Sequence, residues 1–127
     1  MDHPNNAGLV LVVEDEALIA VALQDDLEDR GYSVAGPFNT CAAALAWLTS
    51  STPDAAVLDT VLKDGPCKDV ALKLTSLGVP FVVYSGHSED LELVGELDGA
   101  VWVEKPARGE VLLDAIARVR KGEVGAA

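Results

Sequence analysis

The chain has 127 residues, of which 50% are hydrophobic and 24% charged, with 21 acidic against 9 basic side chains and a formal net charge of −12. This length suits a single domain, and the excess of acid disfavours direct binding to nucleic acid, which depends on Lys and Arg. No run of about 18 apolar residues is present, so a membrane span is not expected. The N-terminal segment 1–8 has neither a basic nor an apolar region typical of a secretory signal, and we therefore expect a cytoplasmic protein.

Short apolar segments alternate with amphipathic ones along the chain, which predicts βα units that build a parallel sheet. Residues 9–13 form a continuous aliphatic run, typical of a central strand. A helix should follow over residues 16–30 and end at Gly31. Residues 32–35 are predicted as a short strand that Gly36-Pro37 interrupts.

The alternation of apolar and amphipathic segments continues through the rest of the chain. Asn39 or Thr40 is expected to cap a second helix. The remaining predicted strands are 55–59, 81–84 and 100–103, and the remaining predicted helices are 68–77, a weak helix after Ser88, and 108–121. The turn residues of segment 63–66 predict a loop. We expect one domain over residues 9–121, with a flexible segment 1–8 and a frayed tail 122–127.

Polar residues stand where four of the predicted strands end. Glu14 and Asp15 follow the first strand, Asp59 ends the third, Ser85 follows the fourth and Lys105 comes after the fifth. Carboxyl ends of parallel strands share one edge of a sheet, so these side chains are expected to converge. Three neighbouring carboxylates repel one another unless a divalent cation lies between them. A hydroxyl and an ammonium group beside that cation would complete a site for a phosphoryl group.

Four motifs in this order resemble the receiver domain of bacterial two-component response regulators. They are VVEDE at 12–16, VLDTVLKDG at 57–65, VVYSG at 82–86 and VEKP at 103–106. The resemblance implies an α/β, flavodoxin-like fold, in which a doubly wound five-stranded parallel sheet of order 2-1-3-4-5 carries helices on both faces.

The resemblance also implies a role for each strand-end residue. Asp59 corresponds to the phosphoacceptor. Mg²⁺ or Mn²⁺ would be held directly by Asp15 and Asp59, through water by Glu14, and by the backbone carbonyl of Val61. Ser85 and Lys105 would bind the phosphoryl group.

Three further residues correspond to positions that tune or switch such domains. His87 lies where the family adjusts the rate of phosphate hydrolysis, although an exposed loop histidine explains it equally well. Trp102 stands where the family usually has a Tyr or Phe that changes rotamer, and a Trp that merely covers the sheet edge is the alternative. Pro106 follows Lys105 at the junction where the family has a cis peptide bond.

The predicted function is that of a stand-alone response regulator rather than a turnover enzyme. A phosphohistidine on a histidine kinase or a histidine phosphotransfer protein would donate the phosphoryl group, and a conformational change would signal in trans to an unknown downstream protein. Nucleic acid and membranes are not expected as direct partners, and the sequence leaves open whether the chain forms a homodimer.

The strand-end acids have three alternative interpretations, and the sequence argues against two of them. Glu14 and Asp15 could be first-turn acids that stabilise the following helix. A haloacid-dehalogenase-like phosphatase would also use Asp59 as a nucleophile, but its motif requires an acid at position 61, where this chain has Val61. A dinucleotide-binding module would require a glycine-rich turn after the first strand, where this chain has acids.

Overall fold

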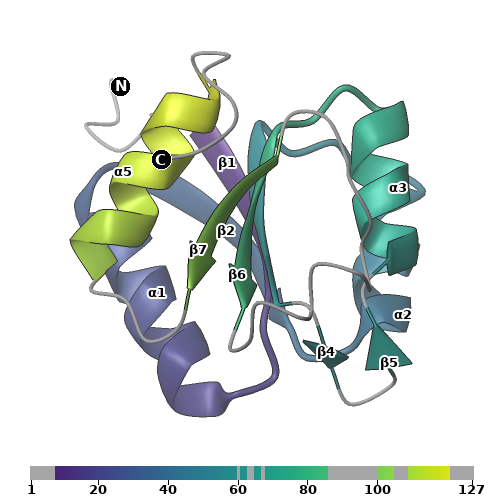
Figure 1. Ribbon diagram of the computed structural model, residues 1–127, viewed down its shortest axis with the longest axis horizontal. Helices are drawn as coiled ribbons and strands as arrows, with labels where there is room; N and C mark the ends of the chain where they lie inside the picture. Colours follow the sequence, from purple (N-terminus) through teal and green to yellow (C-terminus); the bar gives the residue numbers. More distant parts are fainter. Residues whose placement is uncertain are drawn as a thin grey trace.

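A parallel sheet of five strands forms the centre of the computed structural model, which describes residues 8–59, 61–62, 65–66, 68–85, 100–104 and 109–120 (Figure 1). The strands are β1 (Gly8–Val13), β2 (Tyr32–Phe38), β3 (Ala55–Asp59), β6 (Phe81–Ser85) and β7 (Ala100–Glu104). Their order in the sheet is β2-β1-β3-β6-β7, and all four neighbouring pairs are parallel. This is the order that the resemblance implies.

Helices cover both faces of this sheet (Figure 1). The helices α1 (Ala17–Asp29) and α5 (Gly109–Arg120) pack on one face, and α2 (Cys41–Leu48) and α3 (Lys68–Ser76) pack on the other. The helix predicted after Ser88 lies outside the described residues. The doubly wound arrangement therefore holds for the part of the chain that the structure describes.

The strands β1 and β3 form the buried centre because both of their faces are covered. Alternate residues of β1 enter opposite cores: Val10 and Val12 pack with α1 and α5, whereas Leu11 and Val13 pack with α2 and α3. Each apolar side chain of this size contributes roughly 1.5–3 kcal/mol when it is fully buried. A continuous aliphatic sequence is what a strand with two covered faces requires.

Local sequence signals set the ends of two helices. Gly31 follows α1 with a φ of 96°, a conformation that glycine adopts without steric cost. Thr40 is the N-cap of α2, and its side-chain oxygen accepts a hydrogen bond of 3.1 Å from the backbone N–H of Ala43. Of the two predicted N-cap residues, Asn39 and Thr40, the structure therefore has Thr40 as the cap.

The prediction that β2 ends at residue 35 is wrong, because the strand continues through Gly36-Pro37 to Phe38. Gly36 has a φ of 98°, and the register with β1 shifts between Leu11 and Val13. A Cβ atom at Gly36 would lie 2.6 Å from the backbone nitrogen of Phe38, so only glycine fits this bend. Since β2 is an edge strand, the missing N–H of Pro37 is tolerated there.

The predicted loop 63–66 is only partly correct. The strands β4 (Val61–Leu62) and β5 (Gly65–Pro66) form a two-stranded antiparallel sheet directly after β3. Residues 63 and 64, between these strands, lie outside the described residues. Turn residues predict a reversal of the chain, and two antiparallel strands can be joined by two residues, so the same composition is compatible with a small hairpin.

The helices among the described residues are all too short or too polar to traverse a lipid bilayer.

Candidate metal and phosphoryl site

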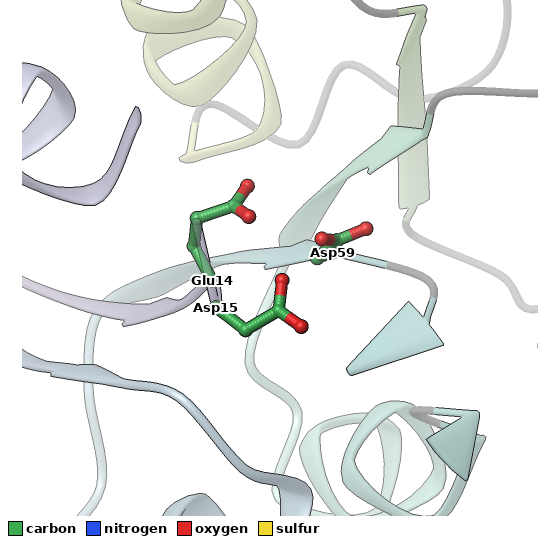
Figure 2. A group of neighbouring side chains, drawn as sticks. All are labelled: Glu14, Asp15 and Asp59. Atoms are coloured by element: carbon green, nitrogen blue, oxygen red, sulfur yellow. The ribbon is translucent and has the colours of Figure 1, made fainter. Parts of the chain in front are cut away.

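Three carboxylates meet at the carboxyl ends of the two central strands. Val13 is paired in register with Leu58, so Glu14 and Asp59 each stand one residue beyond a directly paired position. Figure 2 shows the side chains of Glu14, Asp15 and Asp59 around this edge of the sheet. One ligand oxygen from each of the three lies within 4.8 Å of the others. The structure therefore brings together the three acids that the sequence places at strand ends.

Burial makes this cluster electrostatically costly. Glu14 is 3% exposed and Asp59 is 7% exposed, while Asp15 is half-buried. Two like charges 4 Å apart repel by about 1 kcal/mol in water and by about 4 kcal/mol near a protein surface. Oxygen ligands from carboxylates are those that Mg²⁺ and Mn²⁺ prefer, and a divalent cation would offset the repulsion. The donor set therefore fits such a cation.

Glu14 is held by the backbone on two sides. Its N–H donates a 2.9 Å hydrogen bond to the carbonyl oxygen of Phe38, which joins the end of β1 to the end of β2. Its Oε2 accepts a 3.1 Å hydrogen bond from the N–H of Glu16, the N-cap residue of α1. The bend at Gly36 thus serves the site, because it allows β2 to reach the residue after β1.

The alternative that Glu14 and Asp15 are first-turn acids of α1 is wrong. The helix begins at Ala17, and its first turn contains no acidic residue. Both acids lie in the connection before the helix, where their carboxylates are directed by the end of β1 rather than by helical geometry.

The hairpin after β3 leaves the carbonyl of Val61 pointing away from its partner strand. Val61 is paired with Pro66, which has no N–H. A hydrogen-bonded antiparallel pair exchanges two N–H···O bonds, so this pair must be of the other kind, in which backbone polar groups point outward. The Val61 carbonyl therefore does not accept a hydrogen bond from Pro66.

Strand pairing in β6 and β7 locates the backbone of two other predicted residues, Ser85 and Trp102. Asp59 is paired with Tyr84, so Ser85 stands one residue further along the same edge as the acids. Trp102 is paired with Val83, deeper in the sheet. His87, Lys105 and Pro106 lie outside the described residues.

Sequence reasoning missed the backbone support of Glu14. The carbonyl of Phe38 carries no side-chain signature, and the Gly36-Pro37 pair indicates a break of the strand rather than a bend within it. The glycine of this pair was therefore the only sequence signal for the bend.

Comparisons with known proteins agree with this arrangement. The family model described as "Response regulator receiver domain" matches residues 10–117. The chain is 35% identical over 122 residues to the transcriptional regulatory protein KdpE of Mycobacterium tuberculosis, covering 93% of this chain. It covers 54% of that relative, so it spans about half the length of the curated proteins it matches.

Solved structures share the fold. A response regulator receiver protein from Sinorhizobium medicae superposes with a TM-score of 0.82 at 24% identity, over 94% of this chain and 98% of the other. The solution structure of SdrG from Sphingomonas melonis gives a TM-score of 0.74 at 34% identity, over 87% and 94%.

The family model covers most of the chain, and the cluster of Glu14, Asp15 and Asp59 is typical of the acidic pocket at which such domains are phosphorylated by histidine kinases. The chain belongs to the family of response regulator receiver domains.

Proposed function

We propose that this protein is a stand-alone receiver that accepts a phosphoryl group on Asp59 in a reaction that depends on Mg²⁺ or Mn²⁺. The observation that carries the proposal is the convergence of Glu14, Asp15 and Asp59 at one edge of the sheet. Asp59 is the acid at the end of β3, a rigid and fully buried strand, which is where a nucleophile is held most firmly.

The chemistry is a transfer between two covalent bonds. A carboxylate oxygen of Asp59 attacks the phosphorus of a phosphohistidine, a P–O bond forms, and the P–N bond breaks. The electron pair of the broken bond stays on the imidazole of the donor, which takes up a proton. The product is an aspartyl phosphate on this chain and a free histidine on the partner.

The remaining strand-end residues have supporting roles in this proposal. Asp15, Asp59 and the Val61 carbonyl would hold the cation directly and Glu14 would hold it through water. When bound, the cation neutralises charge on the phosphoryl oxygens. Ser85 and Lys105 would bind those oxygens as a hydroxyl donor and an ammonium group, and His87, Trp102 and Pro106 would adjust the lifetime or readout of the phosphorylated state.

Signalling would follow from a change of population between two conformations. The phosphoryl group adds about 1.5 to 2 negative charges and favours whichever conformation makes more contacts with it. The donor would be a histidine kinase or phosphotransfer protein, and the readout would be binding of a separate downstream protein.

Phosphotransfer with a matched control tests the proposal. The protein is incubated with a panel of phosphorylated histidine kinases and Mg²⁺, and intact mass and peptide mapping locate the product. We expect one phosphoryl group on Asp59 in the wild type and none in Asp59→Asn. Asp54→Asn changes an acid at the opposite end of the same strand and should be phosphorylated like the wild type.

Two outcomes would contradict the proposal. One is a phosphoryl group mapped to a residue other than Asp59. The other is the absence of any product from donors that phosphorylate a known receiver in parallel. Repeated turnover of a small phosphate ester by the wild type would instead support the dehalogenase-like phosphatase.

A further inference from the structure

The bent end of β2 contacts both the acidic edge of the sheet and helix α2. Phe38 ends the strand, and its carbonyl oxygen accepts the 2.9 Å hydrogen bond from the N–H of Glu14. The centre of the Phe38 ring lies 6.3 Å from that of Trp47, and the two rings are tilted by 45°. Phe38 therefore contacts the acidic cluster through its backbone and the last turn of α2 through its side chain.

The packing around Phe38 gives its carbonyl a defined position. Tilted aromatic pairs at this separation attract each other, and both Phe38 and Trp47 pack against the core beneath α2 and α3. The chain after Phe38 is fixed as well, since Thr40 caps α2 through the hydrogen bond from Ala43. The residue that supports Glu14 is thus held by its side chain and by the chain that follows it.

The bend before Phe38 is a further restraint, and it requires glycine. Gly36 has a φ of 98°, and an added Cβ atom would lie 2.6 Å from the nitrogen of Phe38 and 2.9 Å from the carbonyl oxygen of Val12. Both atoms belong to the backbone, so neither can turn aside as the end of a flexible side chain would. An alanine at this position should therefore push the end of β2 away from the end of β1, where Phe38 meets Glu14.

The position of Glu14 matters for a cation because its carboxylate has little freedom. The side chain is 3% exposed, and its Oε2 accepts a hydrogen bond from the N–H of Glu16. One of its oxygens lies within 4.8 Å of ligand oxygens of Asp15 and Asp59. Metal affinity is sensitive to groups that orient the ligands. A shift of the Glu14 backbone would move its carboxylate, and that of the next residue Asp15, relative to Asp59.

We propose that Phe38 is a positioning residue for the divalent cation. Its carbonyl holds Glu14 in place, and its ring makes this support depend on the packing of α2 through Trp47. The inference rests on the cation site of the proposed function and extends it to β2 and α2. Phe38 is not itself a ligand of the cation.

Two glycine substitutions separate the position of Glu14 from backbone strain. Gly36→Ala and Gly78→Ala both place an alanine at a positive φ, 98° and 73°, but a Cβ atom at Gly78 meets nothing within 4 Å. Both variants should unfold more easily than the wild type in a chelator. Only Gly36→Ala should weaken Mn²⁺ binding, by roughly 10- to 100-fold, the usual effect of losing a group that orients a metal ligand. Calorimetry on the full chain measures the Mn²⁺ affinity where each variant is folded.

Amide hydrogen exchange reports on the supporting hydrogen bond itself. The N–H of Glu14 donates to Phe38, and the N–H of Asp54 donates to Leu9 at the other end of β1, so the Asp54 amide is the reference. In Gly36→Ala, the Glu14 amide should lose its protection relative to the Asp54 amide. In Gly78→Ala, the ratio of the two exchange rates should be that of the wild type.

A second set of variants tests the aromatic contact. Trp47→Ala removes the partner of the Phe38 ring and should weaken Mn²⁺ binding by roughly 2- to 10-fold. Trp47→Phe keeps an aromatic ring and should restore most of the affinity. Leu45→Ala is the matched control, because Leu45 is a half-buried residue of the same helix on the same core, and residues two apart on a helix face different sides. It should bind Mn²⁺ like the wild type.

An unchanged Mn²⁺ affinity in Gly36→Ala, equal losses in Gly36→Ala and Gly78→Ala, or an unchanged exchange rate of the Glu14 amide would overturn the inference. Equal losses in Trp47→Ala and Leu45→Ala would reject the part of the ring. If Gly36→Ala fails to fold, Trp47→Ala decides, and a Mn²⁺ affinity equal to that of the wild type rejects the role of Phe38. Failure of the wild type itself to bind Mn²⁺ would instead reject the cation site of the proposed function.

Discussion

The two ends of the central sheet handle aspartate in opposite ways. At the carboxyl end, Asp15 and Asp59 lie beside Glu14, so that three carboxylates are close together. At the amino end, Asp54 is matched to its surroundings: its Oδ2 accepts a 2.7 Å hydrogen bond from the N–H of Leu9, and its own N–H donates a 2.8 Å hydrogen bond to the carbonyl of Leu9. The same residue type therefore lies beside other acids at one end of the sheet and is bonded to the backbone of Leu9 at the other.

Basic and aromatic groups reinforce the amino end. The guanidinium of Arg120, the last residue of α5, lies 5.8 Å from the centre of the Tyr32 ring. A Cβ atom at Gly8 would be 2.9 Å from Nη1 of Arg120 and 3.1 Å from Oδ2 of Asp54, so the start of β1 lies close to both. Among the described residues, the acid at the amino end therefore lies beside backbone and basic partners, whereas the acids at the carboxyl end lie beside one another.

Addition of a divalent cation should change the free energy of unfolding more than any substitution at either end of the sheet. Mg²⁺ at about 100 times its Kd should raise the free energy of unfolding by about 2.7 kcal/mol, because it binds the folded state only. Asp15→Asn should abolish that gain, and Asp54→Asn should retain it because the amide oxygen can still accept from Leu9. Denaturant unfolding with and without Mg²⁺ measures both. If Mg²⁺ stabilised both variants equally, the acidic cluster would not be the cation site.

Neutralising one aspartate at each end should change stability in opposite directions when no divalent cation is present. Asp15→Asn relieves repulsion and should raise the free energy of unfolding by about 1 kcal/mol, the Coulomb energy of two charges 4 Å apart in water. Asp54→Ala removes the acceptor of the Leu9 N–H and should lower it by about 0.5–1.5 kcal/mol. Unfolding is measured in a chelator, and a destabilised Asp15→Asn would break the comparison.

Loss of the ring contact at the amino end should have the smallest effect. Arg120→Ala should lower the free energy of unfolding by about 0.5–1 kcal/mol, the usual value of an exposed cation–π pair. Arg30→Ala is the comparison variant, since it also removes an arginine but one that forms a surface ion pair with Asp114 at 3.3 Å. Phosphotransfer to Asp59 should be the same in both variants, and a selective loss in Arg120→Ala would show that the amino end also serves the reaction.

Much of this framework was predictable because it depends on local rules. The bounds of β3, Ala55–Asp59, follow from an apolar run that ends on an acid, and the convergence of Glu14, Asp15 and Asp59 follows from the geometry of parallel strands. The N-cap of α2 at Thr40 follows from side-chain chemistry.

Features that depend on tertiary contacts were not predictable. The sequence of Gly36-Pro37 indicates a break, but the neighbouring β1 offers hydrogen bonds that carry the strand on to Phe38. Likewise, nothing near Phe38 in the sequence indicates Glu14, because which residues of β1 and β2 meet is decided only when both strands join the sheet. The positions of Lys105 and His87 stay predictions.

The bend in β2 also bears on self-association. An outer strand displays a row of backbone donors and acceptors that a second molecule can extend into a continuous, intermolecular ladder. Pro37 offers no donor, and the register shift at Gly36 disturbs the spacing that an incoming chain would have to match. The bend that lets Phe38 bond to Glu14 therefore also disfavours aggregation through the edge strand β2.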